Sequence, residues 1–173
     1  RRGDAGTQVA AIDYRGDPPL TESFGPADSA VDHAACLDEA SWRLALVSAG
    51  VATVDDAQSE KYTPHMLNLD KLGALSFSKG CYTGQEVVAR TENLGRSRRR
   101  VMRYRSAAVN VAPGTRLSLQ GEVVGEVVAG AGHELLAVVP LELHREALVI
   151  DADGAQHAAQ PVGLRYSEDR KAW

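Results

Sequence analysis

The sequence predicts an α+β fold with a mixed first part, residues 1–98, and an all-β second part, residues 99–173. Apolar residues at helical spacing are found in the first part, whereas beyond Arg96 short apolar segments alternate with turns that contain glycine. With 173 residues, of which 44% are hydrophobic and 24% charged, the chain can bury a core in one large or two small domains.

From the given residues we expect neither a membrane span nor a signal peptide. No apolar run approaches the roughly 20 residues of a membrane span, and the first residues, Arg-Arg-Gly-Asp, lack the apolar core of a signal peptide. We therefore expect a cytoplasmic protein. Because the sequence begins without Met, we also expect further chain upstream in the intact protein.

The first part begins with a strand and a helix. Residues 8–14 have the β-branched and apolar content of a strand, and the prolines and glycines of residues 15–32 predict a surface loop. Apolar spacing over residues 34–49 predicts an amphipathic helix that ends at the following glycine and turns Trp42 and Leu46 toward the core.

An irregular segment follows this helix. Residues 51–54 are expected to form a short strand. His65 could be catalytic or metal-binding, but a lone histidine near a helix start is more often structural, and no second His or Cys stands at ligand spacing. Asn68 and Asp70 either bind a polar ligand or hold the segment together through hydrogen bonds to its backbone.

The segment Lys-Gly-Cys-Tyr-Thr-Gly-Gln-Glu, residues 79–86, is the strongest functional candidate. Its threonine and glutamate have the spacing of a capping box, which predicts a helix over residues 84–94. Tyr82 and Val87 occupy the positions of a hydrophobic staple, and a glycine at the far end would stop the helix.

Cys81 lies near the start of this helix, two residues from the Lys79 ammonium. The helix dipole and the cation both favour a thiolate, because each lowers a thiol pKa from its ordinary value of about 8.5. Gly80 and Gly84 leave room for a partner or ligand to approach the sulfur. The alternative is that Cys81 is a small apolar residue in a turn.

The only other cysteine is Cys36, 45 positions before Cys81. Neither belongs to a C-x-x-C unit, which argues against a structural zinc site or a redox dithiol. Because Cys36 stands between Ala35 and Leu37 at the start of the apolar helix pattern, we expect it in the core.

Positive charge is concentrated over residues 90–105, where seven arginines stand against one acid. With 19 basic and 23 acidic residues in all, 12 bases and 22 acids remain elsewhere, so a local balance of +6 opposes −10. These arginines are Arg90, Arg96, Arg98, Arg99, Arg100, Arg103 and Arg105. They either pair with acids elsewhere in the fold or form an anion site for phosphates, ligand carboxylates or an acidic partner.

The second part has the segment spacing of a small barrel or sandwich. Its expected strands cover residues 101–107, 115–119, 122–129, 134–139, 147–150 and 155–162. Glycine-containing turns separate most of them, and the tail from Arg165 to Trp173 is polar.

Residues 79–86 resemble the signature of the YgfZ proteins, folate-binding relatives of the glycine-cleavage T-protein, an aminomethyltransferase. The likeness includes Pro-His-Met-Leu-Asn-Leu-Asp at residues 64–70, Leu-Ser-Phe at 75–77 and Val-Val-Ala-Arg at 87–90. It implies that residues 1–98 are the C-terminal part of a folate-binding α+β domain. Residues 99–173 would then form the T-protein-like C-terminal antiparallel β-barrel.

The resemblance also implies a function: a folate-linked accessory factor for iron–sulfur cluster assembly or repair, which supports tRNA-modifying iron–sulfur enzymes. The functional cysteine and lysine of the family fall on Cys81 and Lys79. Cys81 could ligate iron transiently, accept a sulfur or one-carbon adduct, or pair with a partner's cysteine. One thiolate supplies one of the four ligands that a cluster normally takes, so a partner or small thiols would supply the rest. The implied partners are iron–sulfur assembly proteins or client enzymes.

The implied cofactor is tetrahydrofolate, bound by the intact protein. Candidate contacts are Tyr82, Gly84, Gln85, Glu86 and Arg90. Much of the folate cavity is expected to come from the missing upstream half. Two other functions stay open: a tetrahydrofolate-dependent aminomethyltransferase-like activity, and an RNA-binding module that uses the arginines of residues 96–105.

Overall fold

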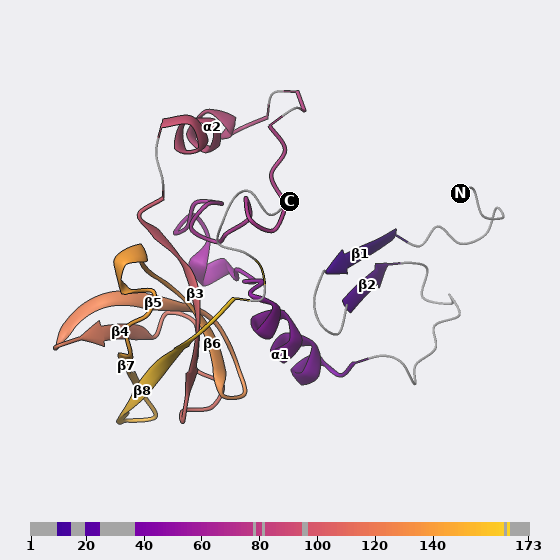
Figure 1. Ribbon diagram of the computed structural model, residues 1–173. Coiled ribbons are helices and arrows are strands. Elements are labelled where there is room, and N and C mark those ends of the chain that lie inside the picture. Colours follow the sequence, from indigo (N-terminus) through magenta and orange to yellow (C-terminus); the bar gives the residue numbers. More distant parts are fainter. Residues whose placement is uncertain are drawn as a thin grey trace.

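The computed structural model describes residues 10–14, 20–24, 37–77, 79–80, 82–94, 97–164 and 166 (Figure 1). Its largest unit is a closed antiparallel barrel with the strand order β3-β6-β5-β4-β7-β8. The strands are β3 (Arg99–Ser106), β4 (Arg116–Leu119), β5 (Glu122–Ala131), β6 (Glu134–Pro140), β7 (Leu148–Ala152) and β8 (Ala155–Val162). All six were predicted from the sequence, although the ends of most differ by one or two residues.

The barrel interior is filled by alternate residues of its strands, because successive side chains of a strand point to opposite faces. This core contains Met102, Tyr104, Leu117, Val127, Leu135, Ala137, Val139, Leu148, Ile150 and Ala159. Tyr104 is fully buried, and burial raises the pKa of its phenol to about 12. Its hydroxyl has no hydrogen-bond partner among the described residues.

Replacing Tyr104 by Phe is therefore expected to raise the free energy of unfolding by about 1 kcal/mol, because it removes a buried hydroxyl that gains no protein hydrogen bond. Tyr62→Phe is the matched control, since the Tyr62 hydroxyl donates to Glu126 at 2.9 Å. In urea denaturation, the free energy of unfolding of this control should be about 1 kcal/mol lower than that of the wild type. A loss of similar size in Tyr104→Phe would show that its hydroxyl is satisfied.

The outer face of the barrel carries a second core. Val101, Val128, Leu136 and Val138 alternate with the interior residues and pack with Val47 and Leu67 from the first part of the chain. Thus, helix α1 (Glu39–Ala49) and the segment around Leu67 lie on the barrel wall rather than apart from it (Figure 1).

Helix α1 is bounded by clear caps. The Asp38 side chain accepts from the Ser41 backbone N–H at 2.7 Å, and Gly50 takes the left-handed conformation, φ 77°, at the C-terminus. A Cβ on Gly50 would also lie 2.7 Å from the Tyr166 ring. The predicted helix end and the burial of Leu46 are confirmed, whereas Trp42 is only half-buried. Cys36 lies outside the described residues.

Two expectations for the first part are wrong. The predicted loop over residues 15–32 contains strand β2 (Leu20–Phe24), which pairs antiparallel with β1 (Ala10–Tyr14). The strand expected over residues 51–54 is absent from the described chain, and the 3-10 helix η2 (Asp56–Gln58) follows instead. The division into two domains at residue 98 stays a prediction.

Candidate functional site at the start of helix α2

The motif at residues 79–86 leads into helix α2 (Gln85–Leu94), close to the predicted range. Gly84, with φ 85°, is the residue before the helix, so the N-cap lies there and not at Thr83. The Tyr82 backbone N–H donates to the Gln85 side chain at 3.3 Å, and the Gln85 N–H donates to the Tyr82 carbonyl at 3.1 Å. This pair differs from the capping box predicted for Thr83 and Glu86, because the Tyr82 acceptor is its backbone carbonyl and the Glu86 carboxylate accepts from Arg90 instead.

Lys79 and Tyr82 contact each other across the motif. The Lys79 Nζ lies 4.7 Å from the centre of the Tyr82 ring, a cation–π distance worth about 0.5 to 1 kcal/mol at an exposed site. No described atom lies within 4 Å of where a Cβ would stand on Gly80 or Gly84. Cys81 is outside the described residues. The two glycines leave the backbone on either side of it open to approach.

Glu86 and Arg90, both predicted to contact folate, pair with each other at 2.9 Å one helical turn apart. Their side chains are 84% and 69% exposed, so the pair contributes at most about 0.5 kcal/mol. The predicted hydrophobic staple is wrong in its second member: Val87 is 59% exposed, and Val88 is the buried residue.

The irregular segment before the motif is fastened to strand β3. Strand β8 pairs with β3 only at residues 103–106. In the part of β3 before these residues, the Val101 N–H donates to the Met66 carbonyl at 2.7 Å. The Asn68 side chain donates to the Val101 carbonyl at 2.9 Å and to the Tyr166 hydroxyl at 3.0 Å. Asn68 itself is left-handed, φ 59°, a strain that these bonds offset. The segment thus takes the place of β8 along this edge.

Arg100 completes this network. It forms two hydrogen bonds with Asp70, at 2.8 and 2.9 Å, and donates to the His65 carbonyl at 3.0 Å and to Asn68 Oδ1 at 3.1 Å. Burial alone would raise the pKa of Asp70, but the hydrogen bonds and charge of Arg100 outweigh it and lower that pKa below its ordinary value. Of the two interpretations of Asn68 and Asp70, these contacts support the structural one, and His65 is buried.

A second arginine network joins the barrel to helix α1. Glu134 accepts from Arg103 and Arg105 at 2.9 Å and from the Ser48 hydroxyl at 2.8 Å. Burial would raise the pKa of Glu134, but these donors lower it to about 2. The side chain of Arg103 is only 7% exposed, so the Arg103–Glu134 ion pair is buried.

Most described arginines of the basic run therefore have intramolecular partners. Arg99 also does, since it donates to the Val124 carbonyl at 2.9 Å. Arg98 is exposed, and Arg96 lies outside the described residues. These contacts support the interpretation that the arginines pair within the fold, and they weaken the case for an extended phosphate-binding surface.

The described residues contain neither a metal-binding cluster nor a membrane-spanning helix. No group of three or more His, Cys, Asp or Glu side chains in this part of the chain could hold a metal ion. Over the same residues, the helices are too short or too polar to cross a membrane.

Many curated proteins are similar to this chain, and two of them are described here, although no family model matches. The tRNA-modifying protein YgfZ of Edwardsiella ictaluri (strain 93-146) is 29% identical over 144 residues, 78% of this chain and 44% of the relative. The protein of the same name from Vibrio atlanticus (strain LGP32) is 33% identical over 135 residues, 75% of this chain and 40% of the relative. The chain thus spans less than half the length of these relatives.

The fold is also similar to a solved structure. The glycine cleavage system aminomethyltransferase T from Bartonella henselae aligns with a TM-score of 0.51 at 14% identity, over 69% of this chain and 36% of that one. This likeness confirms the predicted fold class, a partial T-protein-like α+β part followed by a small antiparallel barrel. Given the motif at residues 79–86 and the two relatives that match three quarters of its length, this chain belongs to the YgfZ family.

Proposed function

We propose that the intact protein is a folate-linked accessory factor for iron–sulfur cluster assembly or repair, and that it supports tRNA-modifying enzymes in the cytoplasm. The observation that carries the proposal is the motif itself, in which Lys79 and Tyr82 are in contact and Gly80 and Gly84 leave open space at the start of α2. Support comes from the relatives, which are named tRNA-modifying proteins, and from the T-protein-like fold.

Tetrahydrofolate fits the chemistry of these residues in part. A folate carries an anionic glutamyl tail, and Arg90 can exchange Glu86 for a ligand carboxylate at little cost, because their pair is exposed. The half-buried Tyr82 ring offers a flat surface for an aromatic group. The motif is open rather than enclosed, so we expect other parts of the intact protein to supply the remaining walls of the folate site.

The cluster is cargo in this proposal and not a resident cofactor. Cys81 would donate one thiolate to iron, with a partner providing the other ligands. Alternatively, the Cys81 thiolate would attack the outer sulfur of a partner's cysteine persulfide, so that the sulfur moves to Cys81 and the partner's thiolate leaves. Lys79 would favour the thiolate by its charge. Gly80 and Gly84 have no side chains that could hinder a partner at the motif.

Complementation with the full-length protein tests the role of Cys81. In a strain that lacks its own YgfZ protein, Cys81→Ser should leave an iron–sulfur-dependent tRNA modification at the level of the deletion, because a serine hydroxyl is not ionised at neutral pH. Cys36→Ser is the matched control and should restore the modification, as the wild type does. Mass spectrometry of digested tRNA gives the modification level, and circular dichroism checks folding. Full rescue by Cys81→Ser would refute the proposed role.

The same full-length protein separates this function from its alternatives. Aminomethyl transfer requires turnover of an aminomethyl donor with tetrahydrofolate, independently of the tRNA readout. RNA binding by the arginine run would show a steep salt dependence that flattens when Arg98, Arg99 and Arg100 are neutralised. The internal partners of Arg99 and Arg100 disfavour the second alternative.

A further inference from the structure

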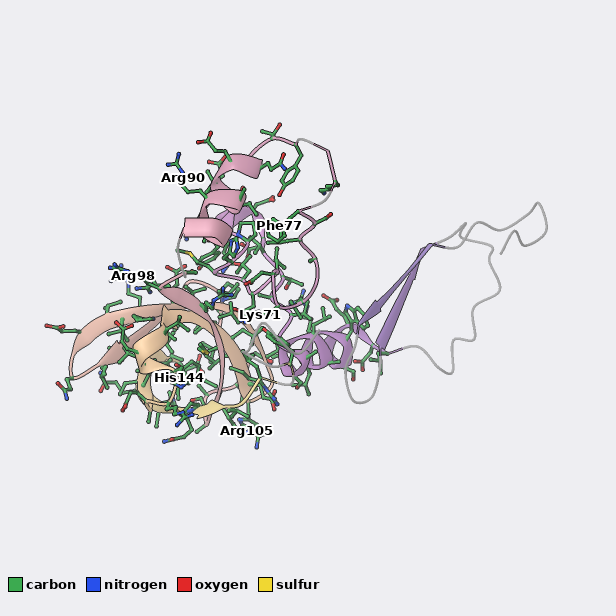
Figure 2. The ribbon with its side chains drawn as sticks, turned by 45° about the horizontal axis from the view of Figure 1, so that its top comes forward. Lys71, Phe77, Arg90, Arg98, Arg105 and His144 are labelled. Atoms are coloured by element: carbon green, nitrogen blue, oxygen red, sulfur yellow. The ribbon has the colours of Figure 1, made fainter. Side chains whose placement is uncertain are left out.

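A cavity of about 380 Å³ lies at the end of the barrel where β3 begins and β8 ends. It is lined by Met102, His144, Arg145 and residues 161–164. Figure 2 shows His144 at the barrel, well separated from Phe77 and Arg90, which lie on the side of α2. None of the motif residues lines it, so this cavity is distinct from the site described above.

Aliphatic side chains form about half of the cavity lining, and polar groups form the rest. Met102 is a buried core residue of the barrel interior, and Pro161, Val162 and Leu164 come from the end of β8 and the residues after it. A cavity of this volume is at the lower end of the range for small-molecule sites, which combine apolar walls with a few polar groups. Its size is sufficient for a small organic molecule.

His144 supplies a hydrogen-bonding group of defined tautomer. Its Nδ1 lies 2.8 Å from the Leu141 carbonyl oxygen, which can only accept a hydrogen bond. In the neutral ring the proton is therefore on Nδ1, and Nε2 carries the free lone pair. The carbonyl of the 3-10 helix η3 (Leu141–Leu143) thus fixes Nε2 as the ring nitrogen that can accept a hydrogen bond.

Arg145 supplies the charge. Its side chain is exposed, and within the described part of the chain no acidic side chain forms an ion pair with it. This distinguishes it from Arg100, Arg103 and Arg105, which all pair with carboxylates of the fold. A guanidinium next to an apolar cavity matches a carboxylate attached to a hydrocarbon body, because its planar fork binds both carboxylate oxygens.

We propose that this cavity binds a small organic carboxylate, with the carboxylate on Arg145, a polar group of the ligand on His144 and the hydrocarbon body against Met102 and residues 161–164. The proposal is independent of the folate-linked function, since it uses none of the same residues. It assigns a second ligand site to the barrel.

Methionine methyl resonances provide a direct test. The chain has two methionines, Met102 in the cavity and Met66 in the outer core, so protein labelled with ¹³C at the methionine methyl groups carries a reporter and an internal reference. Isovalerate is the probe, and uncharged isovaleramide is its neutral match. We expect isovalerate to shift the Met102 signal in a saturable manner and to leave Met66 unchanged.

Two variants complete the test. Arg145→Gln should weaken isovalerate binding about tenfold or more, because it removes a charge-assisted contact. Arg116→Gln, an exposed arginine of β4 outside the cavity, should bind as the wild type does. The proposal is overturned if Met102 does not respond, if Met66 shifts equally, if isovaleramide binds as well as isovalerate, or if Arg145→Gln has no effect.

Discussion

Replacing Glu134 by Gln should lower the free energy of unfolding by about 3 kcal/mol, because removal of one partner of a buried ion pair leaves the other charge uncompensated. Arg103, whose side chain is 7% exposed, would keep its charge without a counter-ion, and the Arg105 and Ser48 contacts would weaken with it. Urea denaturation at neutral pH measures the loss. Glu39→Gln is the control: it breaks the exposed Arg43 pair and should cost less than about 0.5 kcal/mol.

The stabilisation that Glu134 provides should also decrease as the pH falls. The pKa of this carboxyl is about 2 in the folded protein and near its ordinary value of 4.5 when the chain is unfolded. A lowered folded pKa gives stability that is fully present above the unfolded pKa and is lost as the pH falls through the folded one. The stability difference between wild type and Glu134→Gln should therefore shrink between pH 4.5 and about 2. A constant difference across this window would contradict the ion-pair account.

Gly130→Ala is the second large effect, and we expect it to cost about 3 kcal/mol because overpacking against backbone cannot be relieved by a rotamer change. The added Cβ on strand β5 would collide with the Val111 carbonyl oxygen and lie 3.1 Å from the Val111 nitrogen. Gly163→Ala, where no described atom lies within 4 Å of the new Cβ, should stay within about 0.5 kcal/mol of the wild type.

Thermal or urea unfolding of both glycine variants gives the comparison. If Gly130→Ala and Gly163→Ala proved equally stable, the loop that carries Val111 would have to be free to move away from β5. That outcome would contradict the close packing between Gly130 and Val111.

The barrel was predictable because its strands carry a two-residue apolar period and are separated by turns. Strand β8 matches its predicted range, residues 155–162, and the Asp153-Gly154 turn before it has positive φ at both residues. Strand β2 was missed because Leu20 is the first strand residue after two prolines and only Phe24 and Leu20 are apolar in it. Residues 51–54 have strand composition, but the structure pairs them with no strand.

Contacts between residues that are far apart in the sequence could not be predicted from local sequence patterns. Arg100 pairs with Asp70, 30 positions away, and Arg103 pairs with Glu134, 31 positions away. Local charge density over residues 90–105 gave no sign of these partners, because ion pairs of this kind are set by the fold and not by spacing. His144 and Arg145 likewise belong to no recognisable sequence motif, and they line a cavity with Met102 only in the folded barrel.

The candidate site itself was located from local signals, since the motif and the helix after it depend on neighbouring residues. The residue that caps helix α2 was not predicted correctly. Gly84 can adopt positive φ without strain, and the helix begins after it, whereas the sequence pattern placed the N-cap at Thr83. The chemical role of Cys81 is a proposal that the complementation experiment tests, and the role of Lys79 stays a prediction.

The strand order has a consequence for synthesis of the protein. The first barrel strand, β3, pairs with the last, β8, so the sheet cannot close until β8 has left the ribosome. Until then the free edges of β3 and β7 are available to other nascent chains, and unpaired edges of this kind promote aggregation. The nascent chain is therefore most exposed to mispairing in the interval just before residues 155–162 emerge.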